Sequence, residues 1–183
     1  MYHAGTQTIE TDRLLLRHFT MEDAPAMFRN WCNDPEVTRF LTWPPHGSIA
    51  VTESVLQQWV NHYDQADYYQ WAIVPKALGE PVGSIAVVDI DHYCDSLEVG
   101  YCIGRAWWRQ GYMTEALSAV ISDLFARTCC SSITARHDPR NPHSGAVMRK
   151  CGMTQLCVRH GDRNNQGECD AVVYIIFRCE KGV

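Results

Sequence analysis

Several features are scarce or missing in this chain of 183 residues, and each absence excludes a class of protein. No run approaches the roughly 18 consecutive apolar residues that a transmembrane helix requires. The opening segment, MYHAGTQTIETDR, lacks the basic-then-apolar order of a secretory signal peptide. Basic residues are not in excess, because 21 acidic residues outnumber 16 Lys and Arg. We therefore expect a cytoplasmic protein whose main partner is neither a membrane nor nucleic acid.

Paired metal ligands are missing too, although cysteine itself is abundant. The nine cysteines include no C-x-x-C pair, and the eight histidines are scattered. In a chain without a signal peptide, we expect reduced thiols, several of them buried. A zinc site is the alternative, but no ligand pair has the spacing that zinc sites use. The sequence therefore predicts no metal.

The chain does contain enough apolar sequence for a buried core. Hydrophobic residues make up 46% of it and charged residues 20%, which is typical of a globular fold. The length predicts a single domain over residues 1–183. The formal net charge of −5 suits a cationic substrate.

Hydrophobic periodicity predicts an α/β fold. Helical spacing occurs over 20–31, 51–63 and 116–125, and again over 144–150. Strand patterns occur at 13–17, 69–75, 82–90, 96–103, 132–137, 153–160 and 171–179, and the last two flank a polar loop at 161–170. Hairpins together with a strand-helix-strand crossover predict a mixed sheet with helices on its faces.

The stretch WWRQGYMTEA, residues 107–116, stands between a predicted strand and a predicted helix. Gly111 would let the backbone approach a ligand, and the helix N-terminus and Arg109 both favour an anion. The stretch thus fits a pyrophosphate cradle, but also a plain turn in which Thr114 caps the helix. It matches neither the P-loop nor the G-x-G-x-x-G pattern.

A second stretch, NPHSGAVMRKCGM at 141–153, begins a helix after the next predicted strand. Together the two stretches resemble the GNAT family of acetyl-CoA-dependent N-acetyltransferases. That family has an R/Q-x-x-G-x-G/A pyrophosphate loop and, one helix and one strand later, an N-x-x-S/A helix. The segments ETDRLLLR at 10–17 and LEVGYCI at 97–103 are similar to the branch containing the ribosomal-protein alanine N-acetyltransferases. The resemblance covers nearly the whole chain.

The resemblance implies a GNAT fold, whose mixed, mostly antiparallel sheet is splayed at the cofactor site and flanked by helices. It implies acetyl-CoA as co-substrate and no metal. The pantetheine arm would lie against Tyr101, Cys102 and Ile103, and Asn141 and Ser144 would face it near the thioester. The loop around the pyrophosphate would consist of Arg109, Gln110, Gly111, Tyr112, Met113 and Thr114.

The chain departs from the family pattern at three positions. Trp108 stands first in the loop, and Met113 stands where a Gly or Ala is expected, so the methionine side chain must point away from the phosphates. Met148 occupies the position at which many members have a tyrosine that protonates the leaving thiolate. Ser144 is the nearest replacement, although its hydroxyl could instead bind the cofactor or cap the helix.

The remaining chemistry concerns the acceptor amine. Glu98 is the candidate base, and the alternative is a surface or salt-bridged glutamate. Trp43 and Trp71 could wall the acceptor pocket or belong to the core, and Asn165 could contact the substrate.

The expected acceptor is a primary amine, with a protein N-terminus as the first candidate. A polyamine, antibiotic or amino acid is the rival acceptor, and a non-catalytic acyl-CoA-binding module is the rival function. The sequence leaves the oligomeric state open, a homodimer included.

Overall fold

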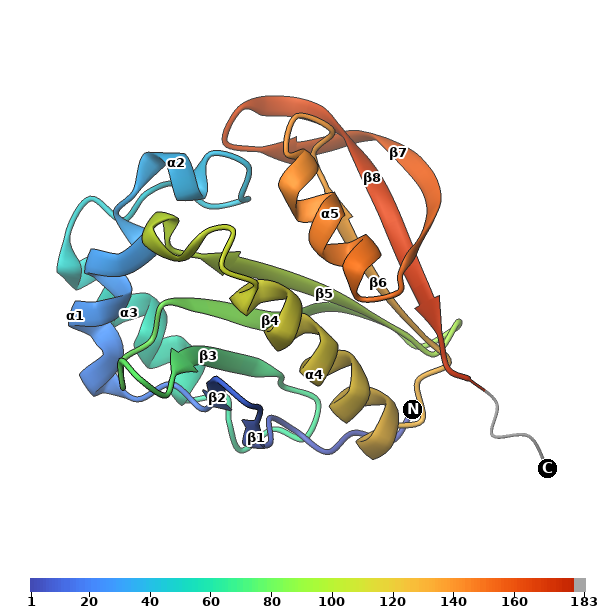
Figure 1. The fold of residues 1–183 in the computed structure, drawn as a ribbon, viewed down its shortest axis with the longest axis horizontal. Coiled ribbons are helices and arrows are strands. Elements are labelled where there is room, and N and C mark those ends of the chain that lie inside the picture. The colour runs from blue at the N-terminus through green and yellow to red at the C-terminus, as the bar shows by residue number, and fades with distance from the viewer. Residues whose placement is uncertain (180–183) are drawn as a thin grey trace.

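An eight-stranded sheet organises residues 1–179, the part of the chain that this computed structural model describes (Figure 1). The strands are β1 (Ile9–Glu10), β2 (Leu14–Arg17), β3 (Gln70–Pro75), β4 (Gly83–Asp91), β5 (Ser96–Ile103), β6 (Ser132–His137), β7 (Thr154–Asn164) and β8 (Gly167–Phe177). The helices are α1 (Ala24–Met27), α2 (Pro35–Thr38), α3 (Ile49–Val60), α4 (Tyr112–Arg127) and α5 (Pro142–Lys150). Single turns of other helix types cover Met21–Asp23, Phe28–Cys32 and Arg105–Trp107.

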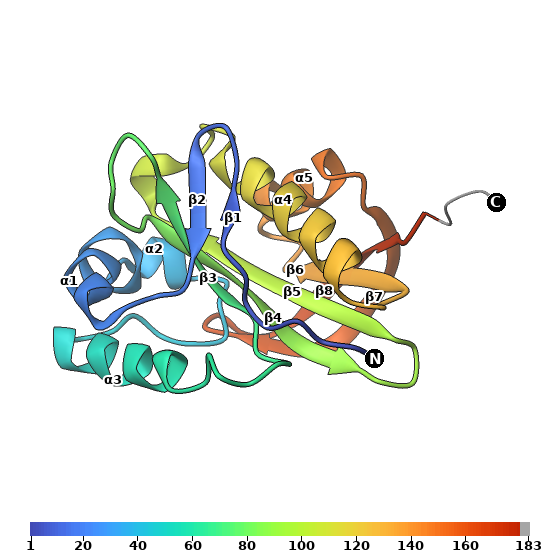
Figure 2. The same ribbon diagram turned by 90° about the horizontal axis from the view of Figure 1, so that it is seen from below.

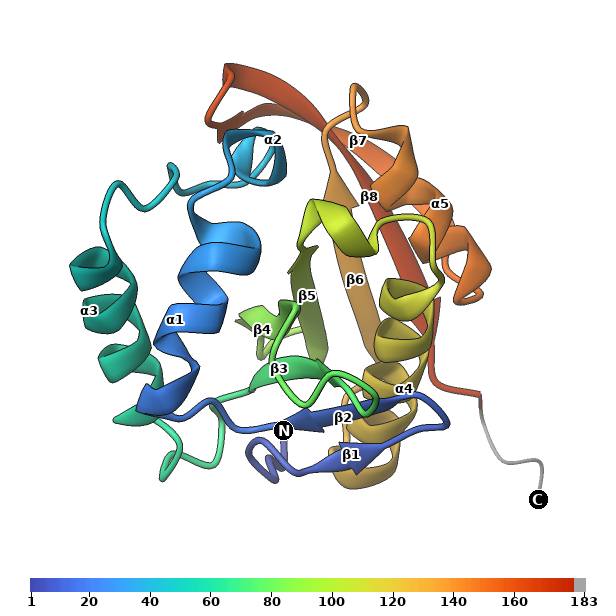
Figure 3. The same cartoon turned by 60° about the vertical axis from the view of Figure 1, so that its left-hand side comes forward.

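The strand order is β1-β2-β3-β4-β5-β6-β8-β7, and neighbouring strands are antiparallel except β5 and β6. These two parallel strands pair only from Ser96 to Glu98 with Ser132 to Thr134. Beyond that point β5 continues to Ile103 and β6 to His137, so the sheet is splayed in its middle (Figure 3). The mixed, mostly antiparallel and splayed sheet expected from the sequence is confirmed.

The helices divide between the two faces of the sheet (Figure 2). Trp71 and Ile73 of β3 point toward α4, whereas Ala72 and Val74 of the same strand pack on the side of α1 and α3. This alternation follows from the two-residue period of a strand and requires both faces to be covered. Leu117, Val120 and Leu124 of α4 are fully buried against the sheet, and this packing fixes where α4 begins.

Most predicted elements are present, but the C-terminal hairpin differs from the prediction. The expected polar loop at 161–170 is wrong, because β7 and β8 continue through it and meet at a two-residue turn, Asn165–Gln166. Asn164 Oδ1 accepts a hydrogen bond from Gln166 N at 2.8 Å, and Gly167 has a φ of +96°. The hairpin is exposed to solvent along β7, so its polar residues reflect exposure rather than a loop.

No helix within residues 1–179 combines the length and the apolar character that crossing a membrane would need. All nine cysteines are free thiols. Within the same residues, no group of three His, Cys, Asp or Glu side chains is placed to hold a metal ion.

Candidate active site

A cavity of about 320 Å³ lies where the sheet splays. Its walls are the end of β5, the loop that leads into α4, helix α5 and the segment around α2. Nine of the residues predicted to bind the cofactor line it: Tyr101, Cys102, Ile103, Arg109, Gly111, Met113, Thr114, Asn141 and Ser144. The cavity therefore brings together β5, the loop and α5, as the sequence predicts. The other two predicted residues, Gln110 and Tyr112, are not among the residues that line it.

The loop before α4 has an unusual backbone. Arg109 and Gly111 both adopt left-handed conformations, with φ of +61° and +82°, and Gly111 is the N-cap of α4. No side chain accepts a hydrogen bond at this N-terminus within the described residues, and the first intrahelical bond is from Glu115 N to Gly111 O at 3.0 Å. The preceding N–H groups are thus free to bind an anion. This geometry fits the pyrophosphate cradle and excludes the alternative in which Thr114 caps the helix.

The N-terminal segment braces this loop. Arg13 Nη1 donates to Gln110 O at 3.0 Å, and Arg13 Nε pairs with Glu115 Oε2 at 2.7 Å. Thr11 Oγ1 donates to Glu115 Oε1 at 2.6 Å. Burial raises the pKa of the Glu115 carboxyl, but these hydrogen bonds outweigh it and hold the pKa below its usual value. Sequence reasoning missed Arg13 and Glu115 as site residues, although the ETDRLLLR motif contains the first of them.

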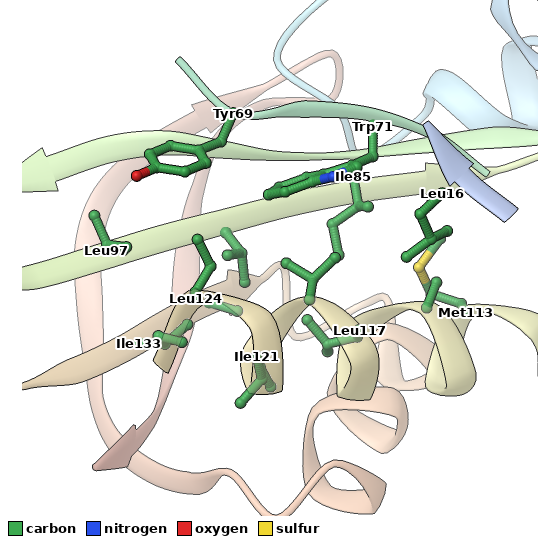
Figure 4. Packing of buried hydrophobic residues seen from close by; sticks show 14 of the residues in the cluster. Leu16, Tyr69, Trp71, Ile85, Leu97, Met113, Leu117, Ile121, Leu124 and Ile133 are labelled. Carbon is green, nitrogen blue, oxygen red and sulfur yellow. The ribbon is translucent and has the colours of Figure 1, made fainter. Parts of the chain in front are cut away.

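Two departures from the family pattern are accommodated. The Met113 side chain is 7% exposed and packs in the core near Leu16 and Leu117 (Figure 4). Trp108 Nε1 donates to Ile103 O at 2.8 Å, which ties the loop to the end of β5. Both residues also line the cavity, and where the phosphates lie relative to them stays a prediction.

Helix α5 presents Ser144 to β5. Ser144 Oγ donates to the Tyr101 hydroxyl at 3.1 Å, and that hydroxyl donates to the Ser144 carbonyl at 3.0 Å. Asn141 is the N-cap of α5, yet its side chain makes no cap hydrogen bond. Ser144 therefore does not cap the helix, and the Asn141 amide remains available at the cavity wall. Met148 is 1% exposed in the core and cannot serve as an acid.

Glu98 lies where β5 and β6 part, and it pairs with Arg136 of β6. Arg136 also pairs with Asp162 at 2.9 Å. Leu97 and Val99 are buried toward α4, so Glu98 points to the opposite face of the sheet. It does not line the cavity. This placement favours the salt-bridged alternative, while the base role stays a prediction.

The predicted acceptor residues have three different placements. Trp71 as a pocket wall is wrong, because it is fully buried between the sheet and α4 (Figure 4), where its Nε1 donates to Gln7 O at 2.7 Å. Trp43 is half-buried beside the α2 segment, outside the cavity lining, and its role stays a prediction. Asn165 lies at the hairpin tip.

Asn165 joins the hairpin tip to the α2 segment, on the opposite side of the splay (Figure 3). Its side-chain amide donates to Thr38 O at 2.8 Å and also to Trp43 O, and its backbone N donates to Leu41 O at 3.0 Å. We use the name arch for these three hydrogen bonds, which link Asn165 at the hairpin tip to the α2 segment. The side-chain NH2 group of Asn165 is engaged by the protein's own backbone, and its contact with the acceptor stays a prediction.

Asp138, just after β6, holds the hairpin tip from the other side through Asn164. Its buried carboxylate accepts hydrogen bonds from Arg140 N at 2.8 Å, from the Arg140 guanidinium, and from Asn164 Nδ2 at 2.8 Å. The Arg140 guanidinium is the main reason that the pKa of Asp138 lies well below its usual range, and burial opposes this shift. The end of β6 is thereby locked to the hairpin.

The charges around the cavity differ from the charge of the whole chain. Arg109 and Lys150 line it, His143 lies 3.4 Å from Arg109, and no carboxylate of residues 1–179 contributes to its walls. The nearby acidic groups Glu98 and Asp138 are paired with arginines. The cavity therefore suits an anionic ligand, and the overall charge of −5 does not describe the site.

Comparisons with known proteins identify the family of the chain. Residues 13–154 match the family model of the acetyltransferase (GNAT) domain. The N-acetyltransferase YoaA of Bacillus subtilis (strain 168), itself uncharacterized, is 33% identical over 171 residues, which is 93% of this chain and 96% of that protein.

Two solved structures show the same fold. RimL, a ribosomal-protein alpha-N-acetyltransferase in complex with coenzyme A, has a TM-score of 0.82 at 19% identity and covers 93% of this chain and 98% of its own. The microcin self-immunity acetyltransferase MccE, in complex with acetyl-CoA and AMP, has a TM-score of 0.82 at 18% identity and covers 92% and 94%.

Proposed function

The chain belongs to the GNAT family of acetyltransferases, and on that premise we propose which residues hold acetyl-CoA and which amine receives the acetyl group. It is an acetyl-CoA-dependent N-acetyltransferase. The cavity at the splay is the observation that supports the proposed site, because it connects the uncapped N-terminus of α4 to the gap between β5 and β6.

The residues present fit acetyl-CoA. Arg109 and Gly111 both adopt left-handed backbone conformations, and we assign the phosphate oxygens to the free N–H groups of this loop and of the first turn of α4. Arg109 and Lys150 add positive charge along the cavity. The unpaired edges of β5 and β6 offer backbone groups to the amides of the pantetheine arm. We assign the arm to Tyr101, Cys102, Ile103 and Asn141.

The protein's main contribution to the reaction is positioning. A neutral amine attacks the thioester carbonyl when the two are held in contact, and this removes much of the entropic barrier. We assign the stabilisation of the negative charge that develops on the carbonyl oxygen to free N–H groups of β5 at the splay. The protonated amine must first lose a proton, because only the neutral form can attack.

We propose that the acceptor is the α-amino group of a polypeptide N-terminus. An α-amino group has a pKa of about 7.7–8.0 and is partly neutral at physiological pH, whereas a lysine-like amine has a pKa of about 10.4. A cavity without a carboxylate therefore suits the α-amine. We assign Glu98 a structural role in its ion pair with Arg136. The amine then loses its proton to solvent water, because Glu98 does not line the cavity.

Two further features support a peptide over a polycation. Spermidine and aminoglycosides carry several positive charges, and no carboxylate of residues 1–179 lines this cavity to pair with them. We place the peptide end beside the α2 segment, where Leu41 lines the cavity and its carbonyl accepts a hydrogen bond from Asn165 N. RimL, which is described as a ribosomal-protein alpha-N-acetyltransferase, has the same fold and an acceptor of this class.

A panel of amines tests the proposal, with release of the coenzyme A thiol as the measurement. It contains a peptide with a free N-terminus, the same peptide N-acetylated, spermidine and kanamycin. We expect the free peptide to have a kcat/KM at least about tenfold above the other amines, with a rate that rises with pH through the pKa of its α-amine.

Preference for spermidine or kanamycin would show that the acceptor class is wrong. Tight binding of acetyl-CoA without turnover of any amine would instead support the non-catalytic module. The N-acetylated peptide is the control, because it differs from the substrate only at the attacking nitrogen.

A further inference from the structure

A pair of hydroxyl groups meets at the cavity, and neither the loop nor the arch accounts for it. Tyr101 comes from β5 and Ser144 from α5, and both line the cavity. The Ser144 hydroxyl donates to the Tyr101 oxygen at 3.1 Å, while the Tyr101 hydroxyl donates to the Ser144 carbonyl at 3.0 Å. The phenol is thus held on a rigid strand and fixed by two hydrogen bonds.

The strand alternation explains why the phenol points this way. Leu97 and Val99 of β5 are buried toward α4, so Tyr101, two residues further, projects on the same side of the sheet and reaches α5. Met148, one turn beyond Ser144 on α5, is buried and apolar. Among the residues of β5 and α5 that line the cavity, the O–H donors are therefore Tyr101 and Ser144.

We propose that Tyr101 is the acid that protonates the departing sulfur during acetyl transfer, with Ser144 as its positioning residue. This inference rests on the acetyl transfer proposed above. When the carbon–sulfur bond breaks, its electron pair goes to sulfur. The Tyr101 O–H bond then breaks, and its proton forms the thiol of coenzyme A. The phenolate regains a proton from water, which balances the proton that the amine nitrogen releases to water.

The direction of the Ser144 hydrogen bond fits this assignment. Because Ser144 donates to the phenol oxygen, it stabilises negative charge there, which is the charge that Tyr101 carries after giving up its proton. Burial raises the pKa of the Tyr101 phenol, and the bond from Ser144 opposes that rise. The neighbouring titratable group is the Cys151 thiol, whose pKa burial also raises. Tyr101 is therefore protonated at neutral pH.

The experiment compares Tyr101→Phe and Ser144→Ala with the wild-type protein, using acetyl-CoA and the amine that gives the fastest turnover in the panel. We expect Tyr101→Phe to lower kcat by at least about 100-fold, the effect of losing a general acid. We expect Ser144→Ala to lower kcat by about tenfold. Affinity for coenzyme A, measured by calorimetry, should stay within about threefold in both variants.

The matched control is Tyr174→Phe. Tyr174 is a buried tyrosine on β8 whose hydroxyl accepts a hydrogen bond from Arg149 at 2.8 Å, outside the cavity. The Tyr174→Phe variant loses the same hydroxyl oxygen from the same residue type, and its kcat should equal that of the wild-type protein.

A ring-fluorinated tyrosine at position 101 separates an acid from a structural hydroxyl. Fluorination keeps the hydrogen bonds but lowers the pKa of the phenol, so kcat should fall at alkaline pH, where the wild-type protein remains active. A superimposable pH profile overturns the inference, as does a loss of less than about tenfold in Tyr101→Phe or a parallel loss of coenzyme A affinity. If no amine in the panel turns over, the proposed function fails, and with it this inference.

Discussion

The two ends of the cleft are built in different ways. At the loop before α4, backbone conformation makes the site: two left-handed residues and a helix N-terminus lie within residues 109–115. At the arch, side chains make it, since Asn165 and Asp138 join segments that are far apart along the chain. The loop before α4 therefore has a short sequence pattern that can be recognised, whereas the arch has almost none.

The largest effect that would separate the two ends is expected from Gly111→Val. Gly111 has a φ of +82°, which a β-branched residue adopts only with strain, and an added Cβ would lie 3.3 Å from Arg13 Nη2. The loop must shift, and it loses N–H contacts to the pyrophosphate. We expect the Kd of coenzyme A, measured by calorimetry, to rise by roughly 30-fold, which is the loss of one charge-assisted hydrogen bond.

Gly79→Val is the control for this substitution. Gly79 also has a left-handed φ, +74°, and its added Cβ would meet nothing within 4 Å. Both variants should lose about 1–2 kcal/mol of unfolding free energy from backbone strain, but only Gly111→Val should lose affinity. Equal coenzyme A binding by the two variants would contradict the role of the loop.

The difference between the ends also explains what the sequence could predict. The strands, the long helix α4 and the loop follow from local patterns, so nine of the predicted cofactor residues line one cavity. The sequence leaves Trp71 open between a pocket wall and the core, because an aromatic residue on a strand has the same local signature in both places. The hairpin at 161–170 was missed because its polar residues lie on exposed strands.

The contacts of Arg13 with Glu115 and the arch could not be predicted, because each joins residues that are far apart along the chain. Glu115 is an ordinary helical glutamate until Arg13 is placed beside it, and the two are 102 positions apart. Asn165 and Thr38 are 127 positions apart. Such pairs depend on the finished topology, and a single sequence contains no local evidence for them.

At the arch, the next largest effect is expected for Asp138→Asn. The buried carboxylate accepts hydrogen bonds from Arg140 and Asn164, and an amide cannot accept all of them. Arg140 is the main reason that the pKa of Asp138 is depressed in the folded protein. The stabilisation is therefore present above the unfolded pKa of about 3.9 and is lost as pH falls through the folded pKa.

We expect Asp138→Asn to lower the unfolding free energy at pH 7 by about 1–2 kcal/mol. Urea unfolding should show that the difference from the wild-type protein shrinks steadily below about pH 4. Asp170→Asn is the control in the same hairpin, because its pair with His160 is exposed and stabilises little. A difference that stays constant with pH would mean that the carboxylate charge is not what locks the hairpin.

The smallest effect, and the most selective, is expected from Asn165→Ala. This variant removes the two side-chain hydrogen bonds to the carbonyls of Thr38 and Trp43 while the backbone bond to Leu41 remains. The arch should loosen without moving the loop before α4, so the KM for the peptide should rise by about fivefold, equivalent to one hydrogen bond, while the Kd of coenzyme A stays the same. Gln166→Ala, one residue along the exposed turn, should change neither constant. If Asn165→Ala weakens coenzyme A instead, the two ends of the cleft are coupled, and the arch positions the cofactor as well as the acceptor.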